Sequence, residues 1–190
     1  MFENIIKNVH NRHPLIHCIT NYVSINDCAN IVLACGGAPI MAEDINEVSQ
    51  ITSICQGLDI NIGMLNDNKL SSMLKAGATA NELGIPVILD PVGAGSSDYR
   101  IKAVQNLMSN VQFGVIRGNV SEIKAIAAKQ GIHNIAAGVY ETMQKNKSAM
   151  GVEAGIADKI TDDNIKEMAD FINKLSQKTG AVIAVTGGID

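Results

Sequence analysis

The chain has few aromatic residues and no excess of basic ones. Its 190 residues contain no Trp, three Tyr and three Phe, which leaves too few rings for a surface that stacks on nucleic-acid bases. Lys and Arg number 15 against 19 Asp and Glu, so the net charge is −4. A phosphate backbone requires a basic surface, and we therefore expect no nucleic-acid partner.

Long apolar runs are also missing. No run reaches the length that spans a membrane, and no signal peptide opens the chain, so we expect a cytoplasmic protein with no membrane association. The four cysteines, Cys18, Cys28, Cys35 and Cys55, lack the paired spacing of metal sites. We expect them to be buried, reduced thiols.

Short apolar segments instead alternate with segments of helical periodicity. Strands are predicted over 14–19, 38–40, 58–62, 86–89, 112–116 and 181–185. Helices are predicted over 2–12, 24–35, 47–55, 66–83, 99–110, 121–130, 134–147 and 161–178. Ser24 and Asn66 are predicted N-caps, and Gly84 is predicted to end the helix that Asn66 begins. The alternation indicates an α/β fold with a mainly parallel sheet and helices on both faces, in a single domain.

Small, polar or charged residues follow these predicted strands. In parallel sheets, ligands bind beyond the carboxyl ends of the strands. The recurrence therefore favours a binding site at one edge of the sheet over ordinary loop chemistry. The positions are Thr20 and Asn21, Met41, Gly63, Asp90, residues 117–119 and residues 186–188.

The stretch VILDPVGAGSS, residues 87–97, places Asp90 at the end of an apolar strand, followed by Pro and two glycines. A carboxylate in this setting can hold a metal ion or a phosphate close to the backbone. A local turn closed by the Asp90 side chain is the structural alternative. The glycines match neither a Walker loop nor a dinucleotide-binding fingerprint.

The stretch VIRGNVSEI, residues 115–123, is compatible with two interpretations. In the structural one, Asn119 caps a helix and Glu122 lies in its first turn, near the positive end of the helix dipole. In the functional one, Glu122 and Asp90 reach a Mg²⁺ ion directly or through water. Arg117 then faces the phosphates of a nucleotide.

Six blocks, in order, resemble the hydroxyethylthiazole kinases, a family of the ribokinase-like superfamily that acts in thiamine salvage. The resemblance covers nearly the whole chain and is weakest over 131–160. The blocks are PLIHCITNYV, GGAPIMAED, LDINIGML, ANELGIPVILDPVGAGSSDYR, VIRGNVSEI and VIAVTGGID.

The resemblance implies transfer of the ATP γ-phosphate to the primary alcohol of 4-methyl-5-(2-hydroxyethyl)thiazole. It implies a homotrimer with the thiazole pocket between subunits. The site residues it implies are Met41, Asn21, Val23 and Gly63 for the thiazole, Asp90 and Glu122 for Mg²⁺, and Arg117, Thr186 and Asn119 for ATP.

One feature departs from the family pattern. The glycine-rich turn with a cysteine that forms the family's catalytic centre has no counterpart within residues 1–190, so we expect no catalytic residue here and a domain that is C-terminally incomplete. Two alternatives to a thiazole kinase remain. One is a related hydroxymethylpyrimidine or pyridoxal kinase, which the blocks around Asn21 and Met41 disfavour. The other is a truncated, non-catalytic binder of thiazole or nucleotide.

Overall fold

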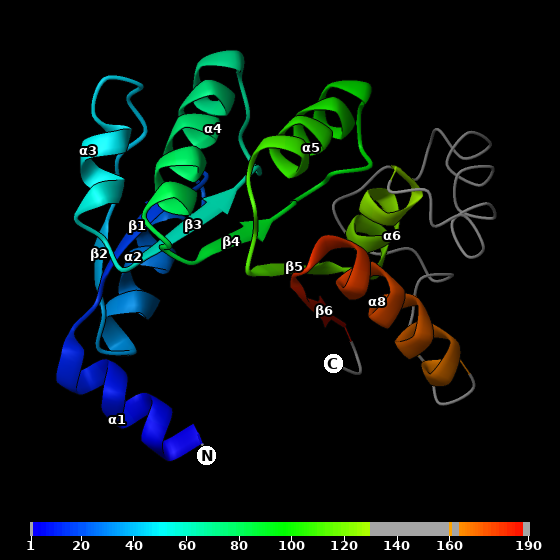
Figure 1. Cartoon of the computed structure of the whole chain (residues 1–190), viewed down its shortest axis with the longest axis horizontal. Helices are drawn as coiled ribbons and strands as arrows, with labels where there is room; N and C mark the ends of the chain where they lie inside the picture. The colour runs from blue at the N-terminus through cyan, green and yellow to red at the C-terminus, as the bar shows by residue number, and fades with distance from the viewer. Residues whose placement is uncertain (1, 130–159, 161–163, 188–190) are drawn as a thin grey trace. The chain divides into compact units, whose positions relative to one another are not determined.

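Helices and strands alternate along the chain (Figure 1). The structure is a computed structural model that describes residues 2–129, 160 and 164–187. The α/β class predicted from the sequence is confirmed. In chain order the elements are α1 (Phe2–Arg12), β1 (Leu15–Ile19), α2 (Ile25–Ala34), β2 (Ala38–Ile40), α3 (Val48–Ser53), β3 (Gly57–Asn61), α4 (Asp67–Glu82), β4 (Val87–Asp90), α5 (Asp98–Asn110), β5 (Val115–Asn119), α6 (Val120–Lys129), α8 (Ile165–Thr179) and β6 (Val182–Thr186).

Six strands are described, β1 to β6. β1 pairs in parallel with β2 and β3, and β5 pairs in parallel with β6. By compactness the chain divides into two units, residues 1–89 with 109–112, and residues 90–108 with 113–190.

In the first unit, β1 lies between β2 and β3. Figure 1 shows α3 and α4 on one side of these strands and α2 on the other. Both Ile60 and Asn61 of β3 are buried although consecutive strand residues point to opposite faces, so β3 is covered on both faces. Helix α4 buries Met73, Ala76 and Ala80, whose spacing of three and four residues places them on one face.

In the second unit, β5 and β6 pair from Val115 with Val182 to Asn119 with Thr186. Helix α8 buries Met168, Phe171 and Leu175 along one face. The apolar spacing that predicted this helix is therefore the spacing of its core contacts.

Two local predictions are wrong. Ser24 occupies the N-cap position of α2, but its side chain makes no capping hydrogen bond. Instead, the Asn21 side chain accepts the Ser24 N–H at 3.0 Å. The strand predicted over 112–116 is displaced to Val115–Asn119, because its pairing with β6 extends through Asn119.

Two other local predictions are confirmed. Asn66 caps α4, since its side chain accepts the Lys69 N–H at 2.9 Å. Gly84 follows the last residues of α4 in the left-handed region, with φ of 69°, a conformation that favours glycine. The helix predicted over 134–147 lies outside the described residues.

The cysteines differ in burial. All four are free thiols; Cys18 and Cys55 are buried, Cys28 is half-buried and Cys35 is exposed. The expectation of burial is therefore wrong for Cys35.

Helix α4 packs closely against the residue that follows α5. A Cβ at Gly77 would lie 2.5 Å from Cγ2, 2.8 Å from Cγ1 and 3.2 Å from Cβ of Val111. Rotation of the valine exchanges its methyl groups but leaves its Cβ in place, so a change of rotamer does not relieve this contact.

We expect Gly77→Ala to lower the free energy of unfolding by roughly 1 kcal/mol. Overpacking costs about 1–3 kcal/mol, whereas the gain in helix propensity is about 1 kcal/mol. Urea denaturation measures the change. Adding Val111→Ala removes the two methyl groups, so the double variant should be more stable than Gly77→Ala alone. If Gly77→Ala is as stable as the parent chain, the proposed close packing is wrong.

Candidate active site

Two of the predicted thiazole residues meet in the first unit through an asparagine. The Asn21 amide donates to Oδ1 of Asn61 at 3.3 Å, and the same oxygen accepts the Gly63 N–H at 2.8 Å. A Cβ at Gly63 would lie 2.8 Å from Asn21 Nδ2 and 2.9 Å from Asn61 Oδ1. Glycine at position 63 therefore allows the two amides to approach each other.

The other two predicted thiazole residues differ in exposure. Met41 follows β2 and is half-buried. Val23 lies in the turn before α2 and is 90% exposed, so it does not line a buried pocket within this chain. Tyr22 beside it is also exposed.

A buried lysine from α4 joins the segments that follow β1 and β2. Lys69, which is 4% exposed, donates from Nζ to the carbonyl of Thr20 and lies 2.8 Å from Oε2 of Glu43. Its ammonium is 4.9 Å from the centre of the Tyr22 ring, and the Tyr22 hydroxyl donates to Oε1 of Glu43. The ammonium thus has a carbonyl, a carboxylate and an aromatic face as partners, which offsets the cost of its burial.

This arrangement fixes the charge of Glu43. Burial raises the pKa of the Glu43 carboxyl, but the hydrogen bonds from Lys69 and Tyr22 outweigh burial, and its pKa lies below the ordinary value. The hydrogen bond to Glu43 raises the pKa of Tyr22. Glu43 is therefore the anionic partner and Tyr22 the neutral donor.

A second buried polar group holds the segment after β2. His17 on β1 contacts the carbonyl of Ala42 through Nε2 at 2.8 Å and the hydroxyl of Thr52 through Nδ1 at 2.9 Å. A carbonyl only accepts, so Nε2 carries the proton, and neutral Nδ1 accepts from Thr52. Burial lowers the pKa of His17 below its ordinary value of 6.5, more than the Ala42 carbonyl and the charge of Glu47 raise it.

In the second unit, Asn119 and Glu122 form a reciprocal cap at the start of α6. The Asn119 side chain accepts the Glu122 N–H at 3.0 Å, and Oε2 of Glu122 accepts the Asn119 N–H at 2.8 Å. The structural interpretation predicted the Asn119 cap and the position of Glu122 in the first turn, and the second hydrogen bond, from the Asn119 N–H to Glu122, completes a capping box. The Ser121 hydroxyl also donates to Asn119 Oδ1, at 2.8 Å.

Glu122 also contacts the loop after β4. Its Oε1 accepts the Gly93 N–H at 2.9 Å, and the side chain is 7% exposed. Burial raises the pKa of Glu122 more than the hydrogen bonds from Gly93 and Asn119 lower it, and the charge of Asp90 raises it further. Two carboxylates therefore act on each other at this site.

Arg117 supplies positive charge next to them. Its guanidinium lies 3.4 Å from Oδ2 of Asp90 and is 53% exposed, so part of it remains open to an anion. On the neighbouring strand, Thr186 pairs with Asn119 and Ala184 pairs with Arg117. The residues predicted for ATP thus come from the ends of two adjacent parallel strands.

The carboxylates suit a divalent cation. Each oxygen of Glu122 accepts one N–H and retains a further lone pair. A cation would also relieve the repulsion that Asp90 exerts on Glu122. Asp90 and Glu122 therefore fit the Mg²⁺ that the family resemblance implies, with no change in the helix cap.

The structure thus brings together Asn21 with Gly63 in one unit, and Asp90, Arg117, Asn119, Glu122 and Thr186 in the other. The sequence interpretation missed Asn61 and Lys69. Asn61 is a polar residue at the end of β3. The expectation that ligands bind at the carboxyl ends of parallel strands could therefore have identified it. Lys69 lies within a helix and gave no signal, since charged helical residues usually face solvent.

Comparisons with known proteins give one family for the chain. The model of the hydroxyethylthiazole kinase family matches residues 6–190. The chain is 53% identical over 190 residues to a hydroxyethylthiazole kinase of Clostridium acetobutylicum, covering 100% of this chain and 64% of that protein. It is 45% identical over 190 residues to the enzyme of that name from Desulfovibrio desulfuricans, covering 100% of this chain and 61% of that protein.

A solved structure is also similar. The hydroxyethylthiazole kinase protein of Pyrococcus horikoshii OT3 has a TM-score of 0.77 and 30% identity, over 97% of this chain and 59% of that one. The fold is therefore similar to that of this solved protein, and the chain belongs to the hydroxyethylthiazole kinase family. It spans about three fifths of the length of these relatives. Within the described residues, every helix is too short or too polar to cross a membrane.

The lowered pKa of His17 predicts a loss of stability in acid. The unfolded chain binds a proton near the ordinary pKa of 6.5, whereas folded His17 binds it only at lower pH. The stabilisation is therefore complete above pH 6.5 and falls as the pH drops through that value, by up to about 1.4 kcal/mol per pH unit for one proton.

Unfolding free energies measured by urea denaturation at pH 7 and pH 5 test this. His17→Gln retains a donor and an acceptor but does not titrate, so it should reduce the difference between the two pH values. His10→Gln, at an exposed position on α1, is the matched control and should leave the difference intact. An equal pH dependence in His17→Gln and the parent would exclude His17 as its source.

Proposed function

We propose that this chain provides the substrate, nucleotide and metal residues of an enzyme that phosphorylates the primary alcohol of 4-methyl-5-(2-hydroxyethyl)thiazole with ATP, as in thiamine salvage. The observation that carries the proposal is the 53% identity to a hydroxyethylthiazole kinase over all 190 residues. The grouping of the expected residues at strand ends supports it.

On the nucleotide side, Arg117, Asn119 and Thr186 contact ATP in this proposal. The half-exposed guanidinium of Arg117 is a permanent cation that suits a phosphate. Thr186 is half-buried beside Asn119, so a hydroxyl and an amide lie at adjacent strand ends. The N-terminus of α6 adds the favourable end of a helix dipole.

On the metal side, Asp90 and Glu122 hold Mg²⁺ directly or through water. When bound, the ion neutralises charge on the nucleotide phosphates. Glu122 retains its hydrogen bonds to the Gly93 N–H and the Asn119 N–H, which connect the loop after β4 to the start of α6. The same carboxylate then has both a structural and a metal-binding role.

On the alcohol side, Asn21, Val23, Met41 and Gly63 line the thiazole pocket. The 90% exposure of Val23 supports a pocket that a second subunit completes, and we include a homotrimer in the proposal. Lys69 helps to position this region, since its ammonium donates to the carbonyl of Thr20, the residue that precedes Asn21.

The thiazole assignment predicts selective stabilisation by ligand. The hydroxyethylthiazole should raise the melting temperature of this chain, because a ligand that binds only the folded state stabilises it. Hydroxymethylpyrimidine should do so far less. Gly63→Ala should abolish the shift, since its Cβ would displace the Asn21 amide. Gln50→Ala, an exposed change on α3, should retain it. Equal protection by both compounds would contradict the thiazole assignment.

The metal assignment predicts that Mg²⁺ strengthens ATP binding much less in Glu122→Gln and in Asp90→Asn than in the parent chain. The increase in ATP affinity that Mg²⁺ produces should be more than tenfold smaller in each variant. Glu122→Gln should also lose roughly 1 kcal/mol of stability, because one of two buried N–H groups then faces an amide NH₂. Titration of ATP at several Mg²⁺ concentrations, together with urea denaturation, separates the two effects. Reduced stability with an unchanged Mg²⁺ dependence would leave Glu122 as a helix cap only.

A further inference from the structure

A second cluster of potential metal ligands lies in the first unit. It comprises the thiols of Cys18 on β1 and Cys28 on α2, and the carboxylate of Asp59 on β3. Their ligand atoms all lie within 4.8 Å of one another. Among the residues that the structure describes, this is the one group of three or more His, Cys, Asp and Glu side chains so closely placed.

The spacing is close to that of a tetrahedral site. Two ligands bound at about 2.3 Å in tetrahedral geometry lie about 3.8 Å apart. Cys28 Sγ is already 4.0 Å from Oδ2 of Asp59. Closure around an ion therefore requires ligand movements of about 1 Å or less, which Cys28 can provide because it is only half-buried.

The electrostatics of the cluster favour a cation. Burial raises the pKa of Cys18, and the nearby Asp59 and Cys28 raise it further. Burial also raises the pKa of Cys28, as does the charge of Asp59. All three groups are anionic when ionised, so each makes ionisation of the others less favourable. A bound divalent cation reverses the sign of this interaction.

We propose that Cys18, Cys28 and Asp59 bind a thiophilic divalent cation, for which Zn²⁺ is the best chemical match. Two thiolates and one carboxylate are ligands that Zn²⁺ accepts, and three protein ligands leave a fourth position for water. Binding breaks two S–H bonds, forms two sulfur–metal bonds and releases two protons to solvent. This site shares no residue with the proposed Mg²⁺ site.

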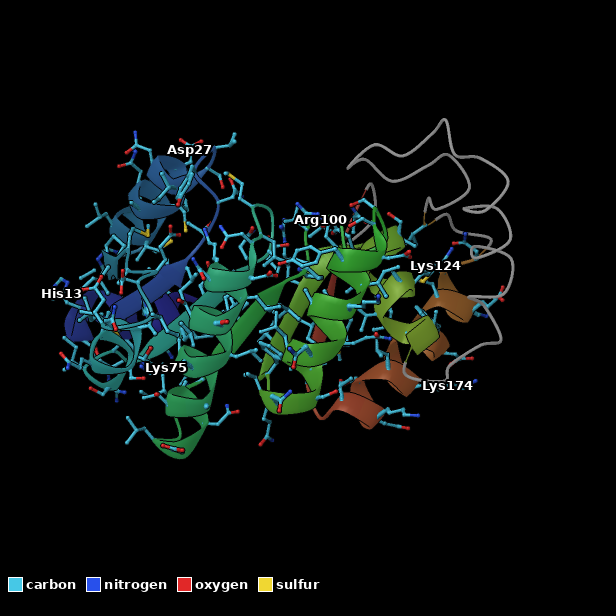
Figure 2. All side chains as sticks on the ribbon, turned by 90° about the horizontal axis from the view of Figure 1, so that it is seen from above. His13, Asp27, Lys75, Arg100, Lys124 and Lys174 are labelled. Atoms are coloured by element: carbon cyan, nitrogen blue, oxygen red, sulfur yellow. The ribbon has the colours of Figure 1, made fainter. Side chains whose placement is uncertain are left out.

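The structural effect of the ion follows from the weak packing of α2. None of the ten residues of α2 is buried. Figure 2 labels Asp27, whose side chain is exposed on this helix. An ion held by Cys28 would connect α2 to β1 and β3, and α2 directly follows the segment that contains Asn21 and Val23. Metal binding would therefore stabilise the helix next to the proposed thiazole residues.

Titration of the reduced chain with Co²⁺ and Zn²⁺ tests the proposal. Co²⁺ should give a thiolate charge-transfer band and the visible bands of a tetrahedral site, at one ion per chain, and Zn²⁺ should displace it. Each ion bound should release about two protons near neutral pH. Zn²⁺ should raise the melting temperature, and a chelator should reverse the rise.

Variants identify the ligands. Cys28→Ser should weaken Co²⁺ binding more than tenfold and reduce the charge-transfer band, and Asp59→Asn should weaken binding while keeping the band. Cys35→Ser, at the exposed end of α2, is the matched control and should behave as the parent. Far-ultraviolet circular dichroism without metal confirms that each variant is folded. The proposal is overturned if the folded, reduced parent shows no charge-transfer band, or if Cys28→Ser binds Co²⁺ as the parent does.

Discussion

Parallel pairing of β1 with β2 and β3 is the constraint on which the first unit depends. Strands that run in the same direction end at the same edge, so the residues after them emerge together. Asn21, Met41 and Gly63 lie at this edge because they stand in the segments that directly follow β1, β2 and β3. Most of β3 and the last three residues of β1 are buried, and polar groups there need partners within the protein. Asn61, His17 and Lys69 provide those partners.

In the second unit, too, a buried group needs partners within the protein, and here that group carries a charge. Glu122 is a buried carboxylate that accepts two backbone N–H groups, and these bonds offset part of the cost of taking a charge from water. Its raised pKa shows that they do not offset all of it. Arg117 compensates part of the negative charge through its ion pair with Asp90, and a cation bound by both carboxylates would compensate more of it. The helix cap and the proposed metal site are therefore compatible uses of one side chain.

The sequence predicted those features that depend on local chemistry. Apolar runs located six strands, and Asn66 and Gly84 marked the ends of α4, because propensity and capping act over a few residues. Prediction failed where a contact other than the expected one decides the local structure. The Asn21 side chain, three residues earlier, accepts the Ser24 N–H while the Ser24 side chain makes no cap, and pairing with the distant β6 moved β5. Cys18 and Cys28 lack metal-site spacing along the chain, yet the crossover to α2 brings their thiols together.

The hydrogen bond from Lys69 to Thr20 also has a consequence for the order of folding. It joins residues 49 positions apart, so it forms only when the chain between Thr20 and Lys69 closes into a long loop. Closing a loop costs chain entropy. The parallel pairs of β1 have the same non-local character, and such contacts form slowly. Lys69 can enter its buried place only after β1 and α4 have come together, since an unpartnered ammonium is costly to bury. We therefore expect the loop that contains Asn21 to reach its final conformation late, after the strands that support it.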